Sequence, residues 1–194
     1  MPSPSPSPPS PSSHDSVVAA LRAAGCVFAE DEAELILSAA RTPQELAAMV
    51  DRRVGGLPLE LVVGWAEFRG LRVAVEPGVF VPRRRTEFLV EHALAQAPSA
   101  SVVVDLCCGS GAGCAALATA LGDIELHACD IDPAAVRCAR RNVAAFGGHV
   151  HAGDLFAALP AHLRGRIDIL AANVPYVPTD QVGLDPNTPL VGQP

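Results

Sequence analysis

The chain has 194 residues, with 49% hydrophobic and only 4% aromatic residues, so its core is expected to consist of Ala, Val and Leu. No uninterrupted apolar run approaches the roughly 18 residues that a membrane-spanning helix needs, which argues against an integral membrane protein. Fourteen Lys and Arg against 21 Asp and Glu give a net charge of −7, which argues against non-specific binding to the nucleic-acid backbone.

The six cysteines are predicted to be free thiols. None of them forms a C-x-x-C pair, and five lie in apolar or helical runs, where a thiol packs as a small hydrophobic group. No Lys or Arg precedes Arg22 and there is no apolar signal-peptide core, so we expect a reduced, cytoplasmic protein. No metal site is predicted, because the conceivable zinc ligands lack a supporting spacing. Those ligands are His127, Cys129, His149 and His151.

The N-terminal part is predicted to contain a tail and a helical subdomain. Residues 1–14 are assigned to a disordered tail, because they are almost entirely Pro and Ser. Residues 15–56 are expected to form a small helical subdomain, with helices over 16–24, 31–40 and from Pro43 onward. The third helix has the clearest signals, since Thr42 is a predicted N-cap, Glu45 completes a capping box and Gly55 ends the pattern.

The rest of the chain is predicted to be a hairpin followed by an α/β domain. Residues 57–85 are assigned to a hairpin linker, because the sequence alternates around Gly70. In residues 86–194, apolar strands alternate with helices, which predicts a parallel sheet covered on both faces. The expected helices cover 86–97, 112–121 and 133–146, and the expected strands cover 102–105, 124–129, 149–152 and 167–171.

The first candidate site is the segment Asp-Leu-Cys-Cys-Gly-Ser-Gly-Ala-Gly over residues 105–113, after a strand and at the start of a helix. Glycines there let backbone N–H groups approach a ligand in the crevice beyond the strand ends. The dinucleotide fingerprint G-x-G-x-x-G is not met, because Cys114 replaces its last glycine. An acidic residue followed by G-x-G is the pattern of Rossmann-type enzymes that use S-adenosylmethionine. The competing interpretation is a glycine turn that binds nothing.

The second candidate site is Asp130, at the end of the next strand. A carboxylate in this position can accept two hydrogen bonds from a ribose diol. Capping of the following helix is the alternative role, but Asp132 before Pro133 suits that role better. Asp154, followed by Leu155 at the end of the third strand, is placed to meet an adenine.

The third candidate site is Asn173-Val-Pro-Tyr176, directly after the fourth strand. Asn and Pro also favour turns, so by itself the segment fits a turn as well as a site. Because all three sites follow strands of one sheet and lie on the same edge, the functional interpretation is favoured.

The sequence resembles the protein N(5)-glutamine methyltransferases, which methylate the glutamine of the Gly-Gly-Gln loop of release factors or a ribosomal-protein glutamine. The resemblance covers roughly residues 16–180 and implies a Rossmann-like class I S-adenosylmethionine-dependent methyltransferase fold with a small N-terminal helical subdomain. The matching motifs are Val104-Asp-Leu-Cys-Cys-Gly-Ser-Gly111, Asp130-Ile-Asp-Pro133, Asn173-Val-Pro-Tyr-Val-Pro178, Gly56-Leu-Pro-Leu59, Phe68-Arg-Gly-Leu71 and Phe80-Val-Pro-Arg-Arg-Arg-Thr-Glu87.

The resemblance also implies roles for individual residues. Asn173 would hold the substrate amide, the Val174 carbonyl would be a second acceptor, and Tyr176 after Pro175 would pack on the substrate side chain. The glycine loop would hold the methionine end of the cofactor, Asp130 its ribose, and Asp154 with Leu155 its adenine. The implied cofactor-binding set is Asp105, Cys107, Cys108, Gly109, Ser110, Gly111, Asp130, Asp154, Leu155 and Asn173.

The sequence departs from the family pattern in two motifs and in its ending. Val174 replaces the first proline of Asn-Pro-Pro-Tyr, but its carbonyl can still accept a hydrogen bond. Cys107 and Cys108 replace a Gly-Thr pair, and Cys107 would be crowded if the turn needed a positive φ. Four strands are expected where the family has seven, which predicts a shortened C-terminus. Residues 167–171 would then form an open sheet edge, prone to self-association.

Two other functions stay open from the sequence alone. One is an adenine-directed nucleic-acid methyltransferase, because methylating an exocyclic amine resembles methylating an amide nitrogen. Such an enzyme would be expected to have a basic face and a target-recognition domain. A shortened, inactive remnant would retain some cofactor binding or act as a protein-interaction module. The expected partner is a protein with an exposed glutamine, with no membrane and no direct nucleic-acid binding.

Overall fold

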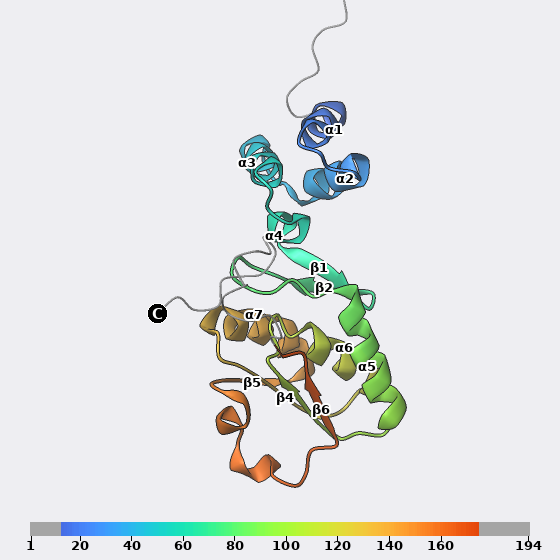
Figure 1. The fold of residues 1–194 in the computed structure, drawn as a ribbon, viewed down its shortest axis with the longest axis vertical. Helices are drawn as coiled ribbons and strands as arrows, with labels where there is room; N and C mark the ends of the chain where they lie inside the picture. Colours follow the sequence, from blue (N-terminus) through green and yellow to red (C-terminus); the bar gives the residue numbers. More distant parts are fainter. Residues whose placement is uncertain (1–12, 175–194) are drawn as a thin grey trace, which may run out of the picture. The chain divides into compact units, whose positions relative to one another are not determined.

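The computed structural model describes residues 13–174, and the chain divides after Val63 into two compact units. Figure 1 shows the elements of both. Residues 1–12 of the predicted tail, Pro175, Tyr176 and the expected ending of the chain lie outside this range. The last two residues assigned to the tail do not belong to it, because Ser13 is the N-cap of a helix that begins at His14. Within residues 13–174, no helix is long and apolar enough to cross a membrane.

The first unit contains four helices among its described residues. They are α1 (His14–Ala23), α2 (Ala29–Ala39), α3 (Pro43–Val54) and α4 (Leu59–Val63). The first three match the predicted helices to within two residues at each end. α4 was not predicted from the sequence, because five residues are too short to show a helical period. Apolar side chains from all four helices form one core, which includes Leu21, Ala33, Ile36, Met49 and Val62.

The predicted cap of α3 is present in a modified form. The Thr42 hydroxyl accepts a hydrogen bond from the Glu45 N–H at 3.1 Å, as a capping box requires. The Glu45 carboxylate instead accepts from the N–H of Arg41, one residue before the cap, at 3.0 Å. A paired Arg53 and Glu32, with N–O distances of 2.6 and 3.0 Å, links α3 to α2.

The second unit begins with a β-hairpin, as predicted. Strands β1 (Trp65–Phe68) and β2 (Leu71–Ala74) are antiparallel. Arg69 and Gly70 between them both have positive φ values, of 51° and 74°, which matches the right-handed twist of a two-residue hairpin. The hairpin turn is fixed from outside by Glu87, whose carboxylate accepts a hydrogen bond from the Arg69 N–H at 3.2 Å.

A parallel four-stranded sheet forms the centre of this unit, in the order β5-β4-β3-β6. After the hairpin, the chain runs through helix α5, then alternates strand and helix as the sequence predicts. The strands are β3 (Val102–Leu106), β4 (Glu125–Asp130), β5 (His149–Ala152) and β6 (Ile169–Ala172). The helices are α5 (Arg84–Gln96), α6 (Ala112–Leu121) and α7 (Pro133–Val143), and the 3-10 turns are η1 (Ala144–Phe146), η2 (Leu155–Ala158) and η3 (Ala161–Leu163).

The two faces of the sheet are covered differently. Helices α5, α6 and α7 lie on one face, where they enclose the main core (Figure 1). The other face is covered by the connection from β5 to β6, which contains only η2 and η3 in place of a helix. Leu163 of η3 is fully buried there against Val102, Val104, Leu106 and Cys129. The expected cover on both faces is therefore present, but the second one is irregular.

Strand β6 is an edge strand in the part of the chain that the structure describes. It pairs with β3 alone, and Leu170 on its surface is 47% exposed. The strand expected at residues 167–171 is present, shifted to Ile169–Ala172, and whether its edge is open stays a prediction.

Candidate functional site

The candidate residues meet at the carboxyl edge of the sheet because the strands are parallel and in register. Leu106, the last residue of β3, lies opposite both Cys129 of β4 and Ala172 of β6. Asp130 of β4 lies opposite Ala152, the last residue of β5. The segments that follow these strands therefore leave the sheet side by side. This edge is the usual ligand position in open α/β sheets.

The glycine loop after β3 requires left-handed backbone at three positions. Cys107, Gly109 and Gly111 have φ values of 53°, 53° and 78°, and Gly111 is the N-cap of α6. Gly111 is needed for a second reason, since an added Cβ would lie 3.1 Å from the Cα of Ala139. The loop thus lets α6 approach α7 closely. Cys107 adopts the positive φ that the sequence made a concern, at a position where an L-residue is strained.

Asp130 is the residue that joins the loops of this edge. Its Oδ2 accepts from the Gly109 N–H at 2.9 Å, and its Oδ1 accepts from the Asp132 N–H at 3.0 Å. Its backbone carbonyl accepts from the Gly153 N–H at 3.0 Å, at the start of the loop after β5. Each carboxylate oxygen has a second lone pair, so Asp130 can hold the glycine loop and still accept from a ligand. Asp132 caps α7 through Ala134 N–H, as predicted.

Asp105, near the end of β3, is buried beneath the glycine loop. Its Oδ2 accepts a hydrogen bond from the Cys114 thiol at 3.5 Å, and an added Cβ on Gly113 would lie 2.9 Å from the same oxygen. Burial raises the pKa of the Asp105 carboxyl to about 7, the hydrogen bonds from Cys114 offset this only in part, and the charge of Asp130 adds to the rise. Asp105 therefore titrates near neutral pH and is not itself open to a ligand.

The charge at this edge is negative. Burial raises the pKa of the Cys107 thiol, and the nearby carboxylates of Asp130, Asp105 and Asp154 raise it further. Such a field favours a cationic ligand over an anionic one. A pyrophosphate would be repelled here, which agrees with the missing dinucleotide fingerprint.

Exposed apolar side chains flank the same loops. Among the described residues of the second unit, the exposed large hydrophobic side chains are Phe88, Ile131, Leu155, Phe156, Leu170 and Val174. All but Phe88 and Leu170 lie in segments that follow the carboxyl ends of strands. Leu155, beside the exposed Asp154, has a positive φ of 42°, and its carbonyl accepts from the Cys129 thiol at 3.4 Å. An exposed apolar surface next to carboxylates suits a ligand with an apolar ring and polar groups.

Asn173 opens onto a pocket beside α5. The pocket has a volume of about 320 Å³, and it is lined by Arg85, Thr86, Phe88, Leu89, His92, Ala172 and Asn173. The Phe88 ring stacks on His92 with the ring centroids 6.1 Å apart. The N-terminal half of α5 and the end of β6 therefore form a half-apolar recess with one amide side chain at its side. Val174 is exposed next to it.

One residue that positions the site was not found from the sequence. The Asn142 side chain on α7 donates to the Ser110 carbonyl and to the Ala74 carbonyl, both at 2.8 Å, and accepts from the Ala74 N–H at 2.9 Å. It therefore ties the glycine loop to strand β2. Asn142 lies among arginines at the end of a helix, a pattern that carries no signal for this role.

Comparison with known proteins identifies the family. Residues 70–188, more than half of the chain, match the family model described as "Methyltransferase small domain". The chain belongs to this methyltransferase family. Membership implies S-adenosyl-L-methionine as the methyl donor and confirms the Rossmann-like methyltransferase fold expected from the motifs.

The relatives of this chain include several proteins named release factor glutamine methyltransferase. The one from Mycolicibacterium smegmatis is 42% identical over 149 residues, 74% of this chain and 53% of the relative. The one from Geobacter sulfurreducens is 39% identical over 142 residues, 71% of this chain and 49% of the relative. The resemblance inferred from the motifs is thus confirmed, and the chain spans about half the length of the curated relatives it matches.

A relative with a different name is also similar to this chain. The 4-amino-L-phenylalanine/4-methylamino-L-phenylalanine methyltransferase of Streptomyces pristinaespiralis is 34% identical over 178 residues, 88% of this chain and 59% of the relative.

Replacing Cys107 by glycine should stabilise the second unit. A non-glycine residue in left-handed backbone costs roughly 1–2 kcal/mol, and the greater freedom of glycine in the unfolded chain returns part of this. We expect Cys107→Gly to raise the free energy of unfolding by about 1 kcal/mol in urea denaturation. Cys107→Ala is the matched control, because it removes the thiol and keeps the Cβ. Equal gains in both variants would show that the thiol, and not the φ angle, is unfavourable.

The raised pKa of Asp105 predicts a specific dependence of stability on pH. The pKa of the Asp105 carboxyl is about 7 in the folded protein and 3.8 ordinarily, so between these values the folded state holds a proton that the unfolded state has lost. The contribution of the protonated carboxyl to the free energy of unfolding is therefore fully present below pH 3.8 and is lost as the pH rises through about 7. We therefore expect wild type to lose stability relative to Asp105→Asn over this range, by up to about 4 kcal/mol. Asp123→Asn, at an exposed carboxylate, is the control. A pH-independent difference between wild type and Asp105→Asn would contradict the assignment.

Proposed function

We propose that the chain methylates the side-chain amide nitrogen of a glutamine in a protein substrate such as a peptide chain release factor. The observation that supports this proposal is Asn173, directly after β6, whose last residue Ala172 lies opposite Leu106, the residue before the glycine loop. It stands in a chain 39–42% identical to relatives named release factor glutamine methyltransferase.

The carboxyl edge fits S-adenosyl-L-methionine in charge and in shape. This cofactor supplies an electrophilic methyl group on a positively charged sulfur. The Asp105, Asp130 and Asp154 carboxylates favour such a charge, and Asp130 has lone pairs left for a ribose diol. Exposed Ile131, Leu155 and Phe156 offer apolar surface for a purine. Cys107, Cys108, Gly109, Ser110 and Gly111 would hold the methionine end through their backbone.

Asn173 would orient the substrate. A glutamine amide nitrogen is a poor nucleophile, because its lone pair is delocalised into the carbonyl. Two acceptors that bind both amide hydrogens turn the nitrogen toward the reacting methyl group and stabilise positive charge as it develops there. The Asn173 side-chain oxygen and the Val174 carbonyl are the proposed acceptors. Pro175 and Tyr176, the other proposed catalytic residues, lie outside the described residues.

The pocket beside α5 supports an amide or amine substrate over a nucleic acid. It lies next to Asn173 and is partly apolar, as a protein side chain requires. The net charge of −7 disfavours a nucleic-acid substrate. A free aromatic amine is the substrate class named for the Streptomyces pristinaespiralis relative, so it is the comparison that a substrate test must include.

We also propose a cellular compartment and a self-association surface for this chain. All six cysteines are free, four of them buried, which fits a reducing compartment such as the cytoplasm. Self-association through β6 is proposed because, among residues 13–174, it pairs with β3 alone and its Leu170 is exposed.

Cofactor affinity should depend more on Asp130 than on Asp132. Asp130→Ala removes two acceptor oxygens at the edge. We therefore expect the dissociation constant for S-adenosyl-L-methionine, measured by calorimetry, to increase at least tenfold, a loss of about 1.4 kcal/mol or more of binding free energy. Asp132→Ala removes a helix cap and should cost about 1 kcal/mol of stability with little loss of affinity. Equal losses of affinity in the two variants would argue against a ligand role for Asp130.

The proposed activity is tested by methyl transfer from a radiolabelled donor to a Gly-Gly-Gln peptide. We expect the full chain to label the Gly-Gly-Gln peptide and not a Gly-Gly-Glu peptide. The Asn173→Ala variant should label neither peptide. Retained cofactor binding by Asn173→Ala, measured by calorimetry, would separate a loss of substrate orientation from a loss of the cofactor site. Labelling of 4-amino-L-phenylalanine or of adenine-containing DNA, without labelling of the glutamine peptide, would overturn the proposal.

A further inference from the structure

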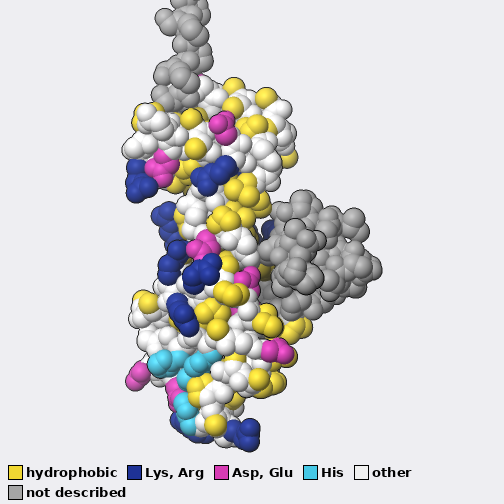
Figure 2. All heavy atoms as spheres, turned by 90° about the vertical axis from the view of Figure 1, so that its left-hand side faces the viewer, with side chains coloured by type: hydrophobic (Ala, Val, Ile, Leu, Met, Phe, Trp, Pro, Cys, Tyr) yellow, Lys and Arg dark blue, Asp and Glu magenta, His cyan; other side chains and the backbone are white. Residues whose placement is uncertain are grey.

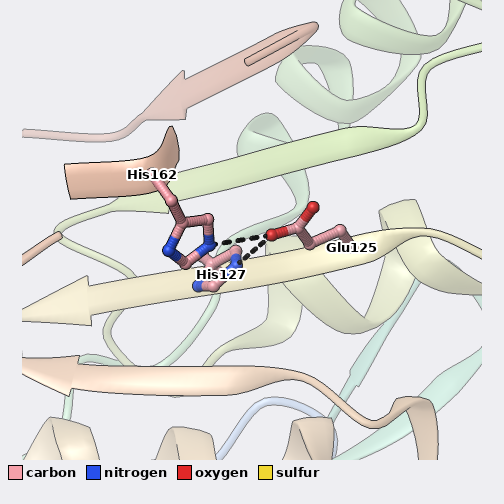
Figure 3. Close-up of side chains that lie close together, drawn as sticks. All are labelled: Glu125, His127 and His162. Carbon is pink, nitrogen blue, oxygen red and sulfur yellow. Dashed lines mark hydrogen bonds and ion pairs between the residues drawn. The ribbon is translucent and has the colours of Figure 1, made fainter. Parts of the chain in front are cut away.

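A second polar cluster lies away from the proposed cofactor edge, on the irregularly covered face of the sheet. Glu125 and His127 extend from the same side of β4, two residues apart, and His162 reaches them from η3 (Figure 3). Glu125 Oε1 lies 3.3 Å from His127 Nε2 and 3.1 Å from His162 Nε2. The ligand-type atoms of all three residues lie within 4.8 Å of one another.

The spacing of these atoms matches the coordination of a small divalent cation. Zinc is bound at about 2.0–2.1 Å by histidine nitrogen and at about 2.0–2.2 Å by carboxylate oxygen, so neighbouring ligand atoms of a tetrahedral site lie about 3.3 Å apart. The two distances from Glu125 Oε1, 3.3 and 3.1 Å, are those of hydrogen bonds in the metal-free site and lie close to this value. Two imidazoles and one carboxylate form a donor set that suits zinc and disfavours magnesium, which binds oxygen ligands.

Neighbouring side chains hold two of the three ligands in place. His127 Nδ1 lies 2.9 Å from His151 Nε2, so His151 can accept the Nδ1 proton and leave His127 Nε2 free as a ligand. Arg166 donates to Glu125 Oε2 at 2.9 Å, on the other oxygen of the carboxylate, which leaves Oε1 directed at the histidines. His151 and Arg166 therefore orient the ligands through atoms other than those that would bind the metal.

The cluster also has a route to solvent. The His127 side chain is 4% exposed, but those of Glu125 and His162 are 31% and 56% exposed. Histidine side chains gather on the face shown in Figure 2, which leaves them accessible from outside. A metal ion could enter from this side and keep a water molecule as its fourth ligand.

We propose that Glu125, His127 and His162 form a zinc site with one open position. Glu125 and His127 precede Asp130, the last residue of β4, by five and three residues, so the site is roughly 10–16 Å from the carboxyl edge, at about 3.3 Å for each residue of the strand. The site is therefore separate from the edge proposed for methyl transfer, although an open fourth position is unlike that of a closed structural zinc site. Bound zinc would join η3 to β4 and hold the connection between β5 and β6 on the sheet.

The sequence could not indicate this site. His162 lies 37 positions from Glu125, and the conceivable set of His127, Cys129, His149 and His151 shares only His127 with it. Cys129 lies on the same side of the strand but its thiol is engaged with the Leu155 carbonyl.

The proposal is tested by titrating ZnCl2 into the purified full chain after removal of metals with a chelator. We expect one zinc ion bound for each chain in calorimetry, and a rise in the unfolding temperature with added zinc. His162→Gln, at an exposed position whose change leaves the core intact, should weaken zinc binding at least 100-fold and abolish the temperature rise. His151→Gln should weaken it by roughly 10–100-fold, as the loss of an outer partner of a ligand does.

Two controls separate this site from the six thiols and from general histidine binding. His14→Gln, in the first unit, should bind zinc as wild type does. Cobalt(II) in place of zinc should give the visible bands of a tetrahedral nitrogen and oxygen site without a thiolate-to-cobalt charge-transfer band. Undiminished zinc binding by both His162→Gln and Glu125→Gln, or a thiolate band in the cobalt spectrum, would overturn the proposal.

Discussion

The hydrogen bonds of Asp130 hold together the edge on which every proposed contact depends. Three backbone N–H groups, from Gly109, Asp132 and Gly153, bond to this one residue. They belong to the loop after β3, the turn before α7 and the loop after β5. Without a common acceptor, these loops would each lose backbone hydrogen bonds that a parallel sheet cannot supply past its last residue. The carboxylate and the backbone carbonyl of this one residue together therefore set the relative positions of three loops.

Strain and burial are concentrated around the same loops. Two of the three non-glycine residues with positive φ among residues 13–174, Cys107 and Leu155, follow strands at the carboxyl edge. The buried Asp105 carboxyl lies beneath them. Each of these features lowers the stability of the folded protein. Strained residues are retained where the surrounding structure holds them in place, and they often cluster at ligand-binding sites. The third such residue, Arg69, is in a hairpin turn whose geometry requires a positive φ.

Sequence reasoning succeeded where the controlling interactions are local. The caps at Thr42 and Asp132 depend on bonds within three residues, and the parallel direction of the strands follows from the alternation of strands and helices. It failed where distant residues meet. Asn142 bonds to Ala74 across 68 positions, and His162 meets Glu125 across 37, so neither role leaves a pattern in the sequence. The 3-10 turns η2 and η3 after β5 were not predicted either, because three or four residues are too few to show a helical period.

The uneven cover of the sheet has a consequence for how the molecule opens. The connection from β5 to β6 is attached to its face of the sheet mainly through Leu163 and a few partly buried side chains, whereas three helices bury the opposite face. Local opening exposes less apolar surface there, so it costs a smaller free energy than global unfolding. Amide hydrogens between residues 153 and 168 should accordingly exchange with solvent earlier than those of α6. The connection from β5 to β6 can thus open locally while helices α5, α6 and α7 stay packed on the opposite face of the sheet.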